Sequence, residues 1–337
     1  MVSPEGHLDV RLKTEGGAVK RVEIDNQRVL SATNLLVGKN PTEAHALIPR
    51  LFSLCGTAQS LAGLAALEAA AGMAPDAGQK ACRATLLAAE TAREQAMRIF
   101  LDWPRLLDEA PDVLLLKRLR SAIAAHDRSL AQGLLDDALG GDPFIDHLAW
   151  ADCGASVPAR LLRRILDQGL DDFGASPFKP LPRLDLKKMA SRLDEDANFT
   201  LHPNWDGEVF ETGAFSRHPR ANNGLLARFL AHLSELRQAV AALCLLENQV
   251  SEPPELISGE GIAEIEAVRG RLIHRVVVCD EKVSAWRILA PTEWNFHSNG
   301  AFVRGLLGVK LTDDLAWKAE MLAVAIDPCV AVKIRVE

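Results

Sequence analysis

The sequence lacks several features that mark whole classes of protein. It has no run rich in lysine or arginine, and its formal net charge of −7 and pI of about 5.8 exclude bulk attraction to nucleic acid or anionic lipid. No apolar stretch approaches the roughly 18 residues that a membrane span needs. The N-terminal segment MVSPEGHLDVRLK lacks the basic and apolar regions of a signal peptide. We therefore expect a cytoplasmic protein that binds no nucleic acid and does not insert into a membrane.

The six cysteines include no C-x-x-C pair, and structural disulfides are disfavoured in the cytosol. Four of them are expected to be small buried hydrophobic side chains: Cys82, Cys153, Cys244 and Cys279. Cys329 differs, because it lies in the segment AIDPCVAVKIRVE, after a helix-breaking proline and before a β-branched run. Its position raises the question of what it binds.

Hydrophobic residues make up 48% of the 337 residues, which is ample for a large core. Residues 7–12 and 18–30 alternate apolar and polar side chains around Gly16-Gly17, which predicts a hairpin within an N-terminal region 1–35. The region 41–168 is predicted to be helical and to begin at Pro41. Because Pro49 and Gly56 interrupt the pattern, Cys55 is expected at a break between helices. Further helices are predicted at 57–72, 78–103 (ending before Pro104), 110–124, 128–138 and 157–168.

Residues 171–224 contain many Pro, Asn, Asp and Gly residues and few helix signals. A loop of that length in a compact domain is usually functional. Region 225–337 is predicted to hold a helix near 224–249, a hairpin around CDEK (279–282), and a last helix near 312–325, capped by Thr312 or Asp313. The pattern as a whole predicts one α+β domain, 1–337, that is predominantly α.

Six short motifs along the chain resemble, in order, those of the large subunit of nickel–iron hydrogenases. The stretch RLFSLCGTAQ resembles the motif R-x-C-G-x-C-x-x-x-H, with Arg50 and Cys55 kept. DPCVAVKIR resembles D-P-C-x-x-C-x-x-H, with Cys329 kept. One motif alone would be weak, but six in order make a specific pattern. They are GKNP (38–41), RLFSLCGTAQ (50–59), WDGEVFETGAFSRH (205–218), EAVRGRLIHRVVV (266–278), APTEWN (290–295) and DPCVAVKIR (327–335).

The chain therefore resembles this large subunit in the degenerate form seen in hydrogenase maturation proteins of the HupK/HoxV kind. The resemblance implies a [NiFe] hydrogenase large-subunit-like fold, with a helical core and small peripheral β-hairpins. It also implies that residues 171–224 wrap a buried metal site, which would explain their irregular pattern.

Besides Val268, which replaces a proline, five positions have lost a cysteine, glutamate or histidine of the family pattern. Phe52 and Val332 stand where two of the four metal-binding cysteines would be, and neither side chain can bind a metal. Thr33 replaces a glutamate and cannot relay protons near neutral pH. Gln59 and Arg335 each replace a histidine, and the second change puts the family's C-terminal metal site in doubt. The resemblance with these losses implies no nickel and no hydrogenase catalysis.

By position, Cys55 matches a bridging cysteine and Cys329 a terminal one, and the resemblance places them together in a deep, mostly apolar pocket. Two thiolates are too few for a closed zinc or iron–sulfur site. They are enough for an iron that already carries diatomic ligands. Arg269 matches an arginine that overhangs the metal, where its guanidinium can donate a hydrogen bond to a cyanide nitrogen. The implied cargo is an Fe(CN)2CO unit, held transiently.

The expected function is that of a non-catalytic assembly factor, a scaffold or carrier for the Fe(CN)2CO unit before its transfer to the large subunit. The implied partners are a HypC-type chaperone, a HypD-type iron–sulfur protein and the large-subunit precursor. Two alternatives stay open: a hydrogenase-like oxidoreductase with a reduced ligand set, and a metal-free chaperone that mimics the large subunit. Two simpler interpretations are also left open. Arg269 would only form an ion pair, and Cys55 and Cys329 would be ordinary core residues. His45, His274 and His297 are expected to be structural.

Overall fold

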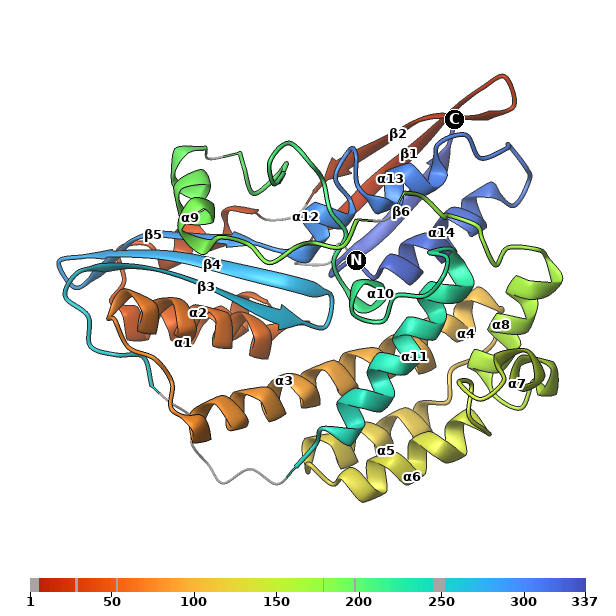
Figure 1. Ribbon diagram of the computed structural model, residues 1–337, viewed down its shortest axis with the longest axis horizontal. Coiled ribbons are helices and arrows are strands. Elements are labelled where there is room, and N and C mark those ends of the chain that lie inside the picture. Colours follow the sequence, from red (N-terminus) through yellow and green to blue (C-terminus); the bar gives the residue numbers. More distant parts are fainter. Residues whose placement is uncertain (1–5, 28–29, 53, 178, 197, 245–251) are drawn as a thin grey trace.

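The computed structural model describes residues 6–27, 30–52, 54–177, 179–196, 198–244 and 252–337. Two small three-stranded sheets lie to one side of a body of long helices, and the two ends of the chain meet in one of these sheets (Figure 1). None of the helices in these ranges combines the length and the apolar character that crossing a membrane requires.

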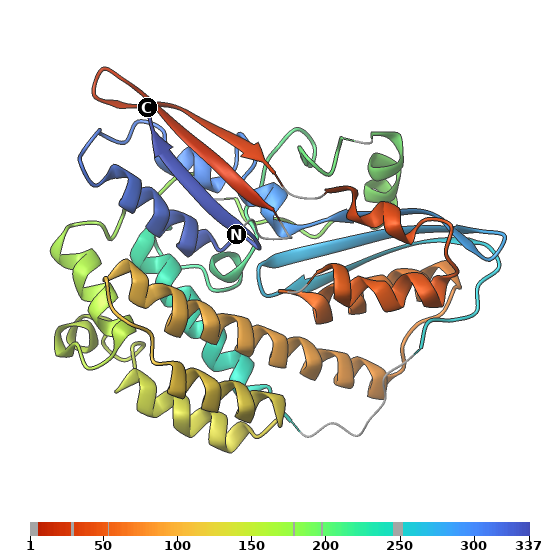
Figure 2. The same cartoon turned by 180° about the vertical axis from the view of Figure 1, so that it is seen from behind.

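The first sheet joins the two ends of the sequence. Strands β1 (His7–Glu15) and β2 (Ala18–Asn26) form the predicted hairpin, and both turn residues, Gly16 and Gly17, have positive φ. Strand β6 (Ala331–Val336) pairs in parallel with β1, so that His7 lies opposite Ala331 (Figure 2). The hairpin ends at residue 26 rather than 30, and a 3-10 helix η1 (Leu30–Leu36) follows residues 28–29, which lie outside the described ranges.

The second sheet contains β3 (Gly259–Ala267), β4 (Gly270–Cys279) and β5 (Lys282–Leu289), all antiparallel in that order. Its β4–β5 hairpin was predicted, and the turn residues Asp280 and Glu281 have positive φ. Helices α1 (Pro41–Leu51) and α2 (Gly56–Ala70) cover one face, with the apolar side chains of α1, α2, β4 and β5 in one cluster (Figure 1).

The helical body is built on α3 (Ala77–Met97) and α11 (Leu225–Ala241), which pack against each other. The prediction that the third helix stops before Pro104 is wrong. The chain passes through a π-helical turn, η2 (Arg98–Asp102), into α4 (Trp103–Leu106), where Pro104 is within the first turn and its missing N–H breaks no helical bond. The other helices of the body are α5 (Val113–Ala124), α6 (Arg128–Leu139), α7 (His147–Cys153), α8 (Val157–Asp167), α13 (Ala301–Leu306) and α14 (Leu315–Ile326).

Two helix boundaries in the C-terminal half also differ from prediction. The N-cap of α14 is Asp314 rather than Thr312 or Asp313. Helix α11 ends at Ala241 rather than near residue 249, and residues 245–251 lie outside the described ranges. Of the four cysteines expected to be buried, only Cys82 is; Cys153, Cys244 and Cys279 are exposed because each lies at or just beyond the end of a helix or strand.

The segment 171–224 is more ordered than its composition predicts. It contains α9 (Leu186–Glu195), whose N-cap Asp185 accepts hydrogen bonds from two backbone N–H groups, and the short α10 (Ala214–Arg217). Helix α9 is too short to give a strong periodic signal, but its buried Met189 and Leu193 pack into an apolar cluster with β4 and β5. Glu211 anchors the segment to α11 through a buried, bidentate ion pair with Arg228.

Candidate functional site

Cys55 is the N-cap residue of α2, at the break between helices that the sequence predicts. Its side chain makes no capping bond. Instead the carboxylate of Glu90, on α3, accepts hydrogen bonds from the backbone N–H groups of Thr57 (2.8 Å) and Ala58 (2.9 Å). Because another residue satisfies the first donors of the helix, the Cys55 sulfur is left free to face a cavity.

Cys329 is positioned by the end of α14 and by Thr292. Helix α14 ends at Asp327 in a left-handed conformation (φ 58°), and Pro328 prevents a further helical turn. The Thr292 hydroxyl lies 3.3 Å from the Cys329 sulfur and 3.3 Å from the backbone nitrogen of the same residue. The hydroxyl can therefore accept from the N–H while it donates to the sulfur, which fixes the side chain. Thr292 belongs to the P-T-x-W-N step, in α12 (Pro291–Asn295).

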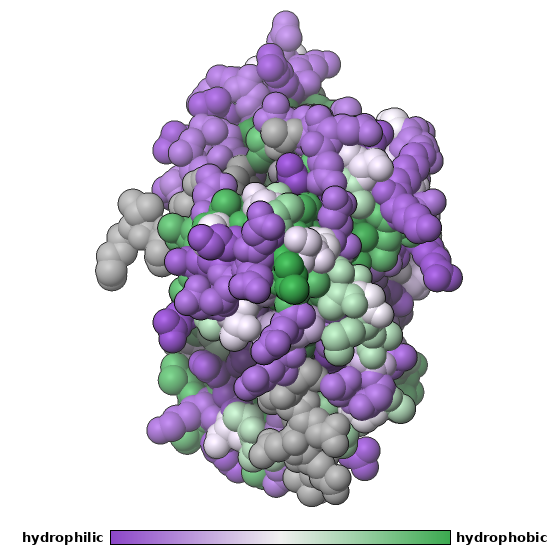
Figure 3. Space-filling view, turned by 90° about the vertical axis from the view of Figure 1, so that its left-hand side faces the viewer, coloured by the Kyte–Doolittle hydropathy of each residue, from purple (hydrophilic) through white to green (hydrophobic). Residues whose placement is uncertain are grey.

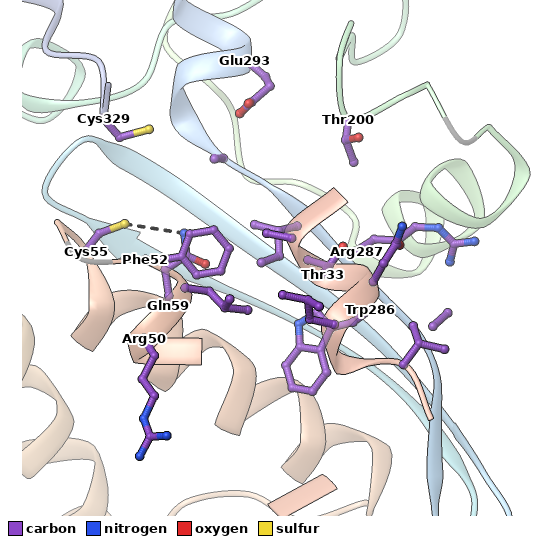
Figure 4. Close-up of a pocket in the computed structure, with 18 of the residues that line it drawn as sticks. Thr33, Arg50, Phe52, Cys55, Gln59, Thr200, Trp286, Arg287, Glu293 and Cys329 are labelled. Atoms are coloured by element: carbon purple, nitrogen blue, oxygen red, sulfur yellow. Dashed lines mark hydrogen bonds between the residues drawn. The ribbon is translucent and has the colours of Figure 1, made fainter. Parts of the chain in front are cut away.

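The two cysteines line one cavity of about 590 Å³, within the range of about 300–1,000 Å³ that is usual for small-molecule sites. Figure 4 shows their sulfurs one above the other at one side of it, Cys55 coming from the α2 end and Cys329 from the C-terminal segment. Leu35, Val37 and Leu54 also line it and are exposed. The end of the molecule seen in Figure 3 has an apolar patch within a mostly hydrophilic surface.

The electrostatics of the site favour a protonated Cys55 in the absence of a metal. Burial raises the pKa of the Cys55 thiol to about 12; the neighbouring Cys329 adds to this rise and Arg269 opposes it. Binding of a metal cation requires loss of the thiol proton. The fold thus places the cysteines of the second and last motifs on one cavity.

Arg269 is buried beside both sulfurs, with an exposed fraction of 7%. Its Nη2 lies 3.4 Å from Glu94 and its Nε 3.4 Å from Asp327, while Nη1 has no hydrogen-bond partner within the described part of the chain. Burial alone would lower the pKa of Arg269, but Asp327, Glu94 and the two cysteines raise it overall, so the group stays charged. The arrangement leaves a buried cationic donor available to a ligand.

Asp327 holds this arginine in place and is itself ionised. Burial would raise the pKa of its carboxyl, but Arg269 and Arg98 lower it to about 2. Asp327 pairs with Arg98 as well as with Arg269. The aspartate of the D-P-C motif therefore has two tasks: it ends α14 and it connects the C-terminal segment to both arginines.

The five positions that have lost a cysteine, glutamate or histidine of the family pattern fall into two groups. Thr33, Phe52 and Gln59 all line the cavity. Val332 and Arg335 are on β6: the Val332 side chain packs against the main core beside β1, and Arg335 is exposed. The lining of the cavity therefore differs from the family pattern at three positions, whereas the two substituted residues on β6 are not part of the lining.

Sequence reasoning missed two residues that shape the site. Thr292 holds Cys329, and Glu293 is buried and lines the same cavity (Figure 4). The signal that could have found them was the APTEWN stretch, which contains both. Within the described residues, no group of three or more His, Cys, Asp or Glu is arranged to hold a metal ion.

Comparison with solved structures defines the fold class. The [NiFeSe] hydrogenase of Desulfovibrio vulgaris Hildenborough superimposes with a TM-score of 0.65 over 94% of each chain, at 18% sequence identity. The protein thus has the fold of a nickel–iron hydrogenase large subunit, as the motifs imply. No protein-family model matches the sequence.

Comparison with characterised sequences defines the family. The hydrogenase expression/formation protein HupK of Azotobacter vinelandii is 32% identical over 344 residues, which cover 98% of each chain. HoxV of Cupriavidus necator, another hydrogenase expression/formation protein, is 30% identical over 91% of each chain. The chain belongs to this HupK/HoxV family.

Proposed function

We propose that this protein is a non-catalytic hydrogenase assembly factor that holds the Fe(CN)2CO unit in the cytoplasm before its transfer to the large subunit. The observation that carries the proposal is the meeting of Cys55 and Cys329, from opposite ends of the sequence, on one cavity beside a buried, incompletely paired Arg269. The names of the relatives, which describe hydrogenase expression and formation, support the broader role.

The residues present suit this cargo. Two thiolates are soft ligands for a low-valent iron that already carries three diatomic ligands. The Nη1 of Arg269 has no partner among the described residues, and it supplies a charged donor for a cyanide nitrogen. A site with two protein ligands holds iron less firmly than one with four, and a carrier must release its cargo.

The enzyme alternative, an oxidoreductase with a reduced ligand set, has less support. Phe52 lines the cavity where a metal-binding cysteine would be, and Thr33 lines it where a proton-relaying carboxylate would be. Neither side chain can do what the replaced residue does. Elemental analysis of protein purified from a hydrogenase-producing host tests this point. We expect iron without nickel, and stoichiometric nickel would instead support the oxidoreductase alternative.

Infrared spectroscopy separates the carrier from a metal-free chaperone that mimics the large subunit. Protein purified without oxygen from a maturation-competent host should show cyanide and carbonyl stretching bands. Cys55→Ala and Cys329→Ala should each lose the bands and fail to support maturation, yet fold, because truncation to alanine removes only one sulfur. Cys153→Ala, at an exposed site, is the matched control. Absence of bands from the wild-type protein would favour the metal-free chaperone.

The partners we propose are a HypC-type chaperone and a HypD-type iron–sulfur protein as donors, and the large-subunit precursor as acceptor. The exposed Leu35, Val37 and Leu54 around the cavity support docking of a protein there, since apolar surface of this kind is typical of interaction sites. Co-purification with each partner, with and without Leu35→Asp/Leu54→Asp, tests this assignment; binding that survives the double variant would place the contact elsewhere.

A further inference from the structure

Three buried side chains form a continuous line of hydrogen bonds that ends at the Cys55 sulfur. The Trp286 indole nitrogen lies 3.1 Å from Nδ1 of His274, and Nε2 of His274 lies 2.7 Å from Oε1 of Gln59. The Gln59 amide nitrogen in turn lies 3.6 Å from the Cys55 sulfur, the contact drawn as a dashed line in Figure 4. Gln59, His274 and Trp286 are each at most 3% exposed, so water does not compete for these bonds.

The chemistry of the groups fixes the direction of this line. An indole N–H can only donate, so Nδ1 of His274 must accept and its proton must be on Nε2. That proton is donated to Oε1 of Gln59, which turns the amide NH2 toward the sulfur. Burial keeps the pKa of His274 at about 3, so the ring stays neutral and the single tautomer persists. The result is a donor that points permanently at Cys55.

The backbone allows this line to form at Gly63, one turn beyond Gln59 on α2. A Cβ at position 63 would lie 2.9 Å from the Trp286 ring and 3.5 Å from Nδ1 of His274. The absence of a side chain there lets the indole and the imidazole pack directly on α2. Neither ring lies on the same element as Cys55, so the strands β4 and β5 set the geometry of a donor on α2.

We propose that Trp286 and His274 are positioning residues that lock Gln59 as a hydrogen-bond donor to the Cys55 sulfur, and that this bond weakens the sulfur's hold on the iron unit. A thiolate that accepts an N–H bond gives less electron density to its metal, and hydrogen bonds to sulfur ligands are a known means of tuning metal centres. The inference rests on the proposed function: Gln59 makes the cargo releasable.

The orientation can be tested without any metal. In ¹⁵N NMR of labelled protein, we expect His274 to carry its proton on Nε2 and none on Nδ1. Trp286→Phe keeps an aromatic ring but removes the indole donor, and it should lose this fixed tautomer. A wild-type His274 protonated on Nδ1 would overturn the proposed direction, because Gln59 would then be free to turn its oxygen toward the sulfur.

The effect on the cargo is tested on the iron-loaded protein. Gln59→Leu should shift the carbonyl and cyanide bands to lower wavenumber and slow transfer to the large-subunit precursor by about ten-fold. Gln59→His, which supplies a ring N–H in place of the amide donor, should return the band positions and the transfer rate toward wild type. Trp286→Phe should shift the bands in the same direction as Gln59→Leu without changing residue 59. Gln238→Leu, at an exposed position on α11, is the matched control.

The outcomes separate the two proposals. Bands present in wild type but unmoved in both Gln59→Leu and Trp286→Phe would overturn this inference and leave the carrier intact. Absence of bands from the wild-type protein would overturn the proposed carrier function and, with it, the role of Gln59 in release of the iron unit. The NMR measurement of the His274 tautomer would still confirm or refute the positioning of Gln59.

Discussion

Phe52 replaces the first cysteine of one motif and Val332 the second cysteine of the other, and their side chains have different surroundings. Phe52 lines the cavity with Cys55 and Cys329. Val332, three residues after Cys329, packs against the main core beside β1. Restoring a thiol at each position should therefore have unequal effects, which makes one variant a control for the other.

If the protein carries the iron unit as proposed, Phe52→Cys should give the cavity a third thiolate. Because each added thiolate strengthens the hold on iron, the variant should purify with more iron and support less maturation. Removal of the ring costs about 3–5 kcal/mol if the space stays empty, and less for a half-buried site, so thermal unfolding should be compared first. Val332→Cys should change neither iron content nor maturation. Equal iron gains in both variants would mean that the β6 side chain reaches the cavity.

The residues of the candidate site could be predicted to different degrees. Cys55, Cys329 and Arg269 lie within recognisable motifs, and their encounter followed from the resemblance. The line from Trp286 to Gln59 could not be predicted, because it joins β5, β4 and α2 and depends on a tautomer that only three-dimensional contact can fix. Sequence motifs identify candidate ligands better than they identify the groups that orient them.

Strand β3 shows how packing can contradict local sequence signals. Its sequence GEGIAEIEA has glycine at its first and third positions, which weakens a strand prediction, and the hairpin was predicted without it. The structure explains the glycine at the third position: a Cβ at Gly261 would lie 1.9 Å from the carbonyl oxygen of Ala66 on α2. The strand can pair with β4 and still lie directly on the alanine-rich helix because it has no side chain there. The β4–β5 hairpin, with ordinary alternation and turn residues, was predicted correctly.

Gly261→Ala should destabilise the protein by about 1–3 kcal/mol or more, because the new methyl group meets backbone atoms that cannot move aside. The free energy of unfolding in denaturant measures this. Gly133→Ala is the control: that glycine is on α6, and a methyl group added there would meet no other described part of the chain within 4 Å, so alanine should add about 0.5–1 kcal/mol through helix propensity. A Gly261→Ala protein as stable as wild type would show that β3 does not contact α2 so closely.

At the scale of the whole molecule, His274 ties folding stability to pH. Burial holds its folded-state pKa at about 3, whereas an unfolded histidine titrates near 6.5. Below pH 6.5 the unfolded chain therefore binds a proton that the folded protein does not. As the pH falls from 6.5 to 3, the free energy of unfolding decreases by about 1.4 kcal/mol per pH unit. Above pH 6.5 the contribution of the neutral His274 to stability is fully present.

This dependence can be isolated with His274→Gln, which keeps polar atoms but cannot titrate. Between pH 7 and pH 5 the difference in unfolding free energy between wild type and variant should shrink by about 2 kcal/mol, because the unfolded wild type gains a proton over most of that interval. Other titrating groups are shared by the two proteins and cancel. Parallel stability curves would mean that the folded protein accommodates a charged His274.

The parallel pairing of β1 with β6 has a consequence for the order of assembly during synthesis. A ribosome makes β1 (His7–Glu15) long before β6 (Ala331–Val336), so the edge of β1 that pairs with β6 stays open, with unpaired N–H and C=O groups, until β6 emerges. Pairings between such distant segments form late. Cys329 lies two residues before β6, so the cavity cannot gain its second thiol until this late part of the sequence has been made. If the protein carries the iron unit as proposed, loading on both thiols must follow synthesis of residue 329, and a shorter nascent chain cannot hold the unit in this way.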